Sequence, residues 1–113
     1  MTHHLLRFDE MVPKPVVNKK TESLTVKGAF VVINDRGLHT RPSTEIVKCA
    51  TSYKADIRLI HKRTEVNARS LLGILMLAAE KGSKIRIVAT GNDAQEAVIA
   101  LQQLAAESFN IQY

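Results

Sequence analysis

The sequence contains no tryptophan, and only 4% of its residues are aromatic. Proteins that bind single-stranded nucleic acid stack bases on aromatic side chains, so this scarcity argues against a nucleic-acid partner. Cysteine is as rare: Cys49 stands alone, which excludes an intramolecular disulfide and a multi-cysteine zinc site. We interpret it as a small buried residue in a reducing compartment, and we expect a cytoplasmic protein.

Long hydrophobic runs are also missing. The longest, residues 71–79, is about half of the ~20 residues that a membrane-spanning helix needs. The first seven residues contain no extended apolar stretch of the kind found in a secretory signal. They do include His3 and His4, but two adjacent histidines without further ligands do not define a metal site. We therefore expect no membrane insertion, no metal and no cofactor.

The composition is that of a globular chain. Its 113 residues are 45% hydrophobic and 24% charged, which suits one domain and argues against extensive disorder. The formal net charge is +5. Such an excess favours anionic partners, among which are nucleic acid, phosphates and acidic protein surfaces, but it does not choose among them.

The pattern of the chain changes near residue 24. Residues 1–23 contain two of the three prolines and no sustained periodicity, and we interpret them as a flexible N-terminal extension. Residues 24–113 form the predicted domain. Alternation and helical spacing predict strands at about 24–33, 55–59, 64–67 and 85–89, and helices at about 40–52, 71–79 and 94–105.

This order, β-α-β-β-α-β-α, indicates the α+β class. Each helix has one apolar stripe, and the strands near residues 57 and 87 alternate between apolar and polar side chains. Elements of this kind bury their apolar faces against one another in two layers. We predict an open-faced two-layer β-sandwich, in which three helices cover one face of a four-stranded antiparallel sheet.

The most informative segment is Gly37-Leu38-His39-Thr40-Arg41-Pro42, at the junction of a strand and a helix. A histidine there occupies the helix N-cap, next to backbone N–H groups that have no partner within the helix. Arg41 adds a permanent cation that can hold an oxyanion through two hydrogen bonds. The segment therefore places an imidazole nucleophile beside a receptor for a phosphoryl group. The simpler alternative is that His39 only caps a helix on a basic surface.

The hexapeptide resembles the active-site signature of the HPr family, the histidine-containing phosphocarriers of the phosphoenolpyruvate-dependent sugar phosphotransferase system. A second block, Val66-Asn67-Ala68-Arg69-Ser70-Leu71-Leu72-Gly73, resembles the signature of the same family around its serine. The resemblance covers roughly residues 24–108. It implies the fold predicted above, and a carrier rather than a turnover enzyme.

The resemblance also implies roles for particular residues. His39 matches the histidine that takes a phosphoryl group from phosphorylated enzyme I, through Nδ1, and passes it to sugar-specific IIA proteins. Arg41 matches the arginine that stabilises the phosphoryl oxygens. Ser70 matches the serine that HPr kinase/phosphorylase modifies in some bacteria. The residues that match partner contacts are Thr40, Leu71, Leu72 and Leu75. We expect a monomer.

Several alternatives stay open at this point. Ser70 precedes an apolar helix, where serine is an ordinary N-cap, and capping is compatible with regulation. Most of the apolar residues from 71 to 77 are expected in the core, with two or three exposed as a contact surface, rimmed by Arg41, Lys48 and Arg69. The chain could instead be a regulatory paralogue that does not serve sugar transport. A nucleic-acid-binding protein and a small-ligand regulatory module are weaker alternatives, because neither explains the hexapeptide.

Overall fold

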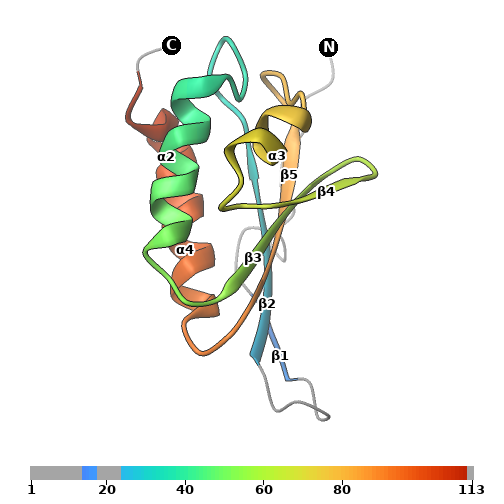
Figure 1. Ribbon diagram of the computed structural model, residues 1–113, viewed down its shortest axis with the longest axis vertical. Helices are drawn as coiled ribbons and strands as arrows, with labels where there is room; N and C mark the ends of the chain where they lie inside the picture. The colour runs from blue at the N-terminus through green and yellow to red at the C-terminus, as the bar shows by residue number, and fades with distance from the viewer. Residues whose placement is uncertain (1–13, 18–23, 112–113) are drawn as a thin grey trace.

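The computed structural model describes residues 14–17 and 24–111. These described residues form five strands, three α-helices and one short 3-10 helix, arranged as Figure 1 shows. In chain order these are β1 (Lys14–Val17), β2 (Leu24–Val31), α2 (Thr40–Thr51), β3 (Asp56–His61), β4 (Thr64–Asn67), α3 (Leu71–Met76), β5 (Lys84–Thr90), α4 (Ala94–Ala106) and η1 (Ser108–Asn110).

The sheet has the strand order β1-β2-β5-β3-β4, and every neighbouring pair is antiparallel. The predicted four-stranded sheet with three helices, β2 to β5 with α2, α3 and α4, is confirmed, and the helices lie on one face (Figure 1). Strand β5 shows why. Ile85, Ile87 and Ala89 are fully buried, whereas Arg86 between them is exposed, so one face of the strand packs on the core.

Strand β1 extends this sheet beyond what the sequence predicted. It lies within the predicted extension, and it pairs with the first half of β2, Lys14 opposite Lys27 and Val17 opposite Leu24. Its four residues are too few to show a period, and they include Pro15, which a strand tolerates at the edge of a sheet. The rest of the extension, residues 1–13 and 18–23, lies outside the described residues.

The core fills the space between the sheet and the helices. The predicted stripe of α4 is buried at Ala94, Ala97, Val98, Leu101 and Ala105, and half-buried at Leu104. This helix lies so close to β2 that a Cβ on Gly28 would approach Val98 Cγ1 to 2.6 Å. Other large core side chains are Val26, Phe30, Val32, Ile46, Ile57, Leu59, Ile74, Ile85, Ile87 and Phe109.

Helix α3 is shorter than predicted. It ends at Met76 rather than near Ala79, because Leu77 is the C-cap and Ala78 takes a positive φ of 49°. The chain leaves the helix at this point to meet the segment before α2, where the Leu38 N–H donates to the Ala79 carbonyl (2.9 Å). A tertiary contact therefore ends a helix that the apolar run alone would continue.

Candidate functional site

His39 lies where the loop after β2 enters α2. It is the N-cap of the helix, with an extended backbone (φ −78°, ψ −170°) and no capping hydrogen bond from its side chain. The residue as a whole is half-buried, and its Nε2 atom is buried. The predicted position of the imidazole, at a strand-to-helix junction, is confirmed.

The loop that holds His39 depends on Gly37. This glycine has a φ of 69°, and a Cβ at its position would lie 2.3 Å from the Ala79 carbonyl oxygen. Its N–H donates to the Asn34 carbonyl (3.0 Å), and the next amide, that of Leu38, bonds Ala79. The loop is thus fixed against the segment that follows α3, and only glycine fits this approach without strain.

The first turn of α2 combines a buried side and an exposed side. Pro42 and Ser43 are buried, and the Ser43 hydroxyl donates to the Leu38 carbonyl (3.1 Å). The Ser43 N–H donates to the His39 carbonyl (3.1 Å), which is the first bond of the helix. The preceding amides, those of Thr40 and Arg41, have no acceptor within the helix, and residues 40–43 include no acidic side chain. This helix end is therefore suited to an anion.

Arg41 stands beside this helix end on the exposed side. It lines a pocket together with Thr44, Glu45 and Lys48 of the same helix and with Asn110 and Ile111 near the C-terminus. Lys48, which was predicted as a rim charge, forms an ion pair with Glu45 (3.3 Å). The geometry brings Arg41 to the same helix end as His39, as the hexapeptide predicted.

The C-terminal turn beside the site was not predicted from the sequence. Ser108, Phe109 and Asn110 all have positive φ angles, between 55° and 61°. Phe109 is fully buried and packs edge-to-face on Phe30, with ring centroids 5.8 Å apart. The Asn34 side chain donates to the Ser108 carbonyl (2.9 Å), so the loop before His39 also holds this turn. The only sign of this turn in the sequence is Phe109, an aromatic residue that follows the last predicted helix.

Ser70 is the N-cap of α3, as predicted. Its hydroxyl accepts a hydrogen bond from the Gly73 N–H (3.0 Å), three residues into the helix. The side chain is half-buried, and it directly precedes the exposed part of α3.

The apolar surface of α3 is close to the predicted one. Leu71, Leu72 and Met76 are exposed, with Leu72 and Met76 at 69% and 67%, whereas Leu75 is half-buried. Ile74 is fully buried. Met76 was not among the predicted contact residues, although its spacing of four from Leu72 places both on one helix face. We call Leu71, Leu72 and Met76 the α3 apolar patch.

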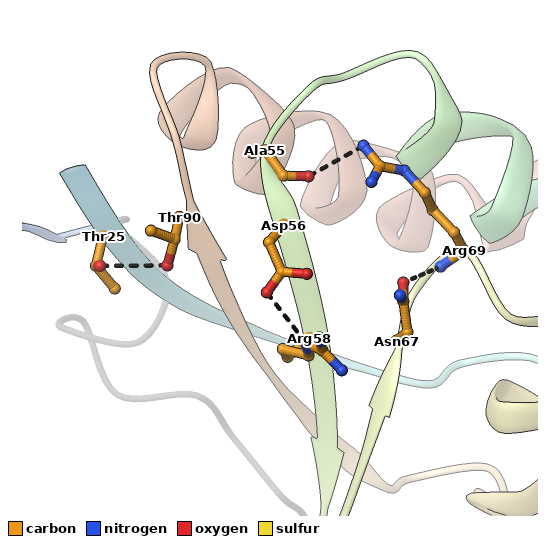
Figure 2. Close-up of polar contacts among 7 residues, drawn as sticks. All are labelled: Thr25, Ala55, Asp56, Arg58, Asn67, Arg69 and Thr90. Atoms are coloured by element: carbon orange, nitrogen blue, oxygen red, sulfur yellow. Dashed lines mark hydrogen bonds and ion pairs between the residues drawn. The ribbon is translucent and has the colours of Figure 1, made fainter. Parts of the chain in front are cut away.

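Arg69 does not rim this patch as a free charge. Its guanidinium donates to the Ala55 carbonyl (3.1 Å) and to the Tyr53 carbonyl, and its backbone N–H donates to Asn67 Oδ1 (2.8 Å). Figure 2 shows the side chain extending from the segment after β4 to the start of β3. The predicted rim charge is therefore a structural residue that joins two loops.

The described residues, 14–17 and 24–111, contain neither a metal-binding cluster nor a membrane-spanning helix. No group of three or more His, Cys, Asp or Glu side chains there could hold a metal ion. His3 and His4 lie outside the described residues. No helix in the described part is long and apolar enough to cross a membrane. Cys49 is a free, half-buried thiol, and burial raises its pKa.

Comparison with known proteins gives one answer. The family model of the PTS HPr component phosphorylation site matches residues 26–107. An HPr from Thermoanaerobacter tengcongensis is 30% identical, with a TM-score of 0.73 over 77% of this chain and 98% of that one. An HPr from Bacillus anthracis is 37% identical, with a TM-score of 0.68 over 72% and 96%. Crh, the catabolite repression protein of Bacillus subtilis, is 32% identical, with a TM-score of 0.60 over 68% and 88%. The chain belongs to the HPr family of phosphocarrier proteins.

Proposed function

We propose that His39 accepts a phosphoryl group from phosphorylated enzyme I and passes it to sugar-specific IIA proteins. The observation that carries this proposal is the position of His39 at the N-terminus of α2. The His39 side chain does not cap the helix, and Arg41 follows two residues later. Helix-end amides and a guanidinium together provide a receptor for the oxygens of a phosphoryl group.

The burial of Nε2 supports a choice between the two ring nitrogens. A phosphoryl donor must reach the lone pair that attacks it, and Nε2 is buried. We therefore assign Nδ1 as the nucleophile, with the proton of the neutral ring on Nε2. As the P–Nδ1 bond forms, the bond between phosphorus and the donor breaks, and its electron pair stays with the donor. The reverse transfer, to a IIA protein, uses the same geometry.

The groups around the imidazole stabilise the phosphoryl group in both directions. The amides of Thr40 and Arg41 lie at the positive end of the α2 dipole, and the Arg41 side chain is exposed at the same end. In transfer, these donors face the equatorial oxygens, where negative charge is spread. The role of the protein is then positioning and electrostatic stabilisation, with no turnover of its own.

The test is incubation of the full chain with enzyme I and phosphoenolpyruvate, followed by mass spectrometry and phosphorus NMR. We expect a gain of one phosphoryl group, labile in acid and stable in mild base, as for a phosphoramidate. His39→Ala should abolish the gain. His61→Ala, which changes a half-buried histidine on β3, is the matched control and should label normally. If His39→Ala were labelled at the parental level, another residue would be the carrier. If the parent were not labelled, the proposal that it accepts phosphate from enzyme I would be wrong.

A second candidate function concerns regulation through Ser70. Its hydroxyl caps α3 immediately before the α3 apolar patch, so a phosphate there would be stabilised by the helix end and would place charge beside a partner surface. The partner would be HPr kinase/phosphorylase. The alternative, a regulatory paralogue that does not serve sugar transport, has one observation behind it: Crh is among the similar structures, with a TM-score below those of the two HPr proteins.

We also propose the cytoplasm as the compartment and a monomer as the working state. A free, half-buried thiol such as Cys49 suits a reducing environment. Among the similar structures, one HPr from T. tengcongensis is described as a dimer and Crh as a dimer with domain swapping. Light scattering of the full chain decides between the two states.

A further inference from the structure

A groove separate from the His39 site carries an unusual concentration of positive charge. It lies between the turn that joins β3 to β4 and the loop that joins α3 to β5. Its volume is about 660 Å³. The charged and titratable side chains that line it are His61, Lys62, Glu80, Lys81, Lys84 and Arg86. Four permanent cations therefore face one carboxylate, and we call this site the basic groove.

The strand pattern explains why the cations gather there. Ile85 and Ile87 are buried toward the helices, so Lys84 and Arg86 extend from the opposite face of β5. Lys62 lies in the two-residue turn between β3 and β4 with a φ of 57°, and its carbonyl accepts from Arg86 Nη2 (3.5 Å). The turn and the strand thus present their cations to one space.

Other contacts fix the walls of the basic groove. His61 Nδ1 lies 3.0 Å from the Leu77 carbonyl, which can only accept, so Nδ1 donates and the end of β3 is tied to the end of α3. Lys81 Nζ forms an ion pair with Asp35 Oδ1 (2.8 Å). Even when Asp35 is counted against Lys81, the cations outnumber the carboxylates at this site.

We propose that the basic groove binds a small ligand that carries two or more linked phosphate groups. The size of the groove is within the range of about 300–1,000 Å³ that is common for small-molecule sites, and its concave form suits a compact ligand better than a flat partner surface. Among the described residues that line it there is no Phe, Tyr or Trp, and the imidazole of His61 is the one aromatic ring, which offers little surface for a base to stack on. Recognition would therefore depend on the phosphate chain itself. A ligand with several phosphate groups can pair with several of these cations at once, which strengthens its binding.

This proposal is independent of the function proposed for His39. None of the residues of the basic groove takes part in the phosphoryl transfer described above. Binding requires neither enzyme I nor phosphoenolpyruvate. A failure of the relay would therefore leave this inference standing, and the reverse also holds.

The test is titration of the full chain with tripolyphosphate, measured by calorimetry and by amide NMR shifts. We expect saturable binding at one site, with the largest shifts at Lys62, Gly82 and Ser83. Inorganic phosphate should bind at least about tenfold more weakly, because it engages fewer cations. A nucleoside triphosphate should bind as tripolyphosphate does, since the phosphate chain is the part that is recognised.

The variant Lys62→Ser/Arg86→Gln removes two cations of the basic groove and should weaken tripolyphosphate binding by about tenfold or more. The matched control, Lys27→Ser/Lys54→Ser, removes the same charge from exposed positions on β2 and before β3, and should bind nearly as the parent. If both double variants lost the same amount of tripolyphosphate affinity, the loss would reflect net charge alone, and the proposal would be overturned. Shifts confined to the start of α2, or binding of an RNA oligomer without binding of tripolyphosphate, would overturn it as well.

Discussion

Single residues of the His39 loop hold the site through backbone contacts rather than through chemistry of their own. Gly37 allows the loop to approach Ala79, and the buried Ser43 hydroxyl binds the Leu38 carbonyl. Neither is part of the proposed phosphoryl receptor. The two residues that are, His39 and Arg41, lie at the start of α2, whose position these backbone contacts fix. The chemistry therefore depends on a packed support that a motif alone does not reveal.

Arg41→Ala should leave the imidazole in place and slow phosphoryl transfer. A lost oxyanion donor costs about 2–4 kcal/mol of barrier in a closed site. Arg41 is exposed, where solvent screens its charge, so we expect the lower end, about 30-fold in rate. Arg41→Lys should recover only part of this, because a point charge lacks the planar fork. Rapid-quench measurement of transfer from enzyme I checks both variants.

The control for Arg41 is Lys48→Ala, which removes an equal charge from the same pocket. Lys48 forms an ion pair with Glu45 there. This variant should transfer at close to the parental rate. If Lys48→Ala and Arg41→Ala slowed transfer equally, Arg41 would act only through the general field of the surface.

At the scale of elements, periodicity predicted most of the fold and failed where distant contacts decide. The alternation of β3 and β5 and the stripe of α4 are properties of short segments, and each was found near its predicted place. The end of α3 was missed because Ala79 is bound by Leu38, far away in the chain. The turn at Phe109 was missed because its partner is Phe30, at the other end of the domain.

The same distinction applies to the candidate site. His39, Arg41 and Ser70 are defined by position relative to a helix start, which the sequence shows. The role of Arg69 depends on carbonyls of Tyr53 and Ala55, which approach it only in the folded chain. The α3 apolar patch lies between these cases: helical spacing relates Met76 to Leu72, but only packing of Ile74 decides which face is exposed.

Ser70→Ala should destabilise the protein by about 1 kcal/mol, because Gly73 loses its capping acceptor. It should still accept phosphate at His39. Ser70→Asp should keep the cap and place a charge beside Leu71 and Leu72, which slows transfer from enzyme I. Urea unfolding and transfer rates measure the two effects separately.

The charge control for Ser70→Asp is Gln95→Glu, which adds one negative charge on the exposed side of α4. It should leave the transfer rate unchanged. An aspartate variant that accepts phosphate as fast as the parent would remove the physical basis of regulation at this serine.

Asp93 joins two elements and makes stability depend on pH. It is the N-cap residue of α4, but its carboxylate makes no capping hydrogen bond and accepts instead from the amides of Lys54 (2.8 Å) and Ala55 (2.9 Å), before β3. The Lys54 hydrogen bond is the main cause of a lowered pKa for Asp93. A lowered pKa in the folded state gives stability that is complete above the unfolded pKa, about 3.9, and is lost as the pH falls through the folded value.

Asp93→Asn should therefore lower the thermal midpoint at pH 7, because one of the two amides then faces an NH₂ group. The difference from the parent should shrink as the pH falls from 5 toward 2, where the parent itself loses the carboxylate. Glu65→Gln on the exposed strand β4 makes the same chemical exchange without these contacts and serves as the control. A midpoint difference that did not change with pH would contradict the assignment of Asp93.

At the scale of the whole molecule, two separate sets of contacts meet around the α3–β5 loop. One side of it binds the loop of His39 through Ala79, and the other side lines the basic groove through Glu80 and Lys81. The Asp35–Lys81 ion pair connects the same two regions. The loop thus lies between the phosphoryl site and the proposed ligand site, although neither site shares a residue with the other.

The contribution of the N-terminal extension is also a question about the whole molecule. Among the residues whose burial is described, the core begins at Val26 in β2, and β1 adds a four-residue ladder at the sheet edge. Each hydrogen bond of such a ladder contributes about 0.5–1.5 kcal/mol net, and ordering the strand offsets part of this. We therefore propose that residues 24–113 fold cooperatively without the extension, with a thermal midpoint lower by less than about 10 °C.

Two truncations test this proposal. Removal of residues 1–23 deletes β1, whereas removal of residues 1–13 leaves β1 with its partner strand, and calorimetry gives the midpoint of each. The difference between the two truncated proteins measures β1 itself, because both lack the first 13 residues. Loss of a cooperative transition on removal of residues 1–23 would show that β1 is part of the folding unit. In that case the domain begins at the edge strand rather than at Leu24, since a ladder that is required for folding must stabilise β2 before the helices pack on it.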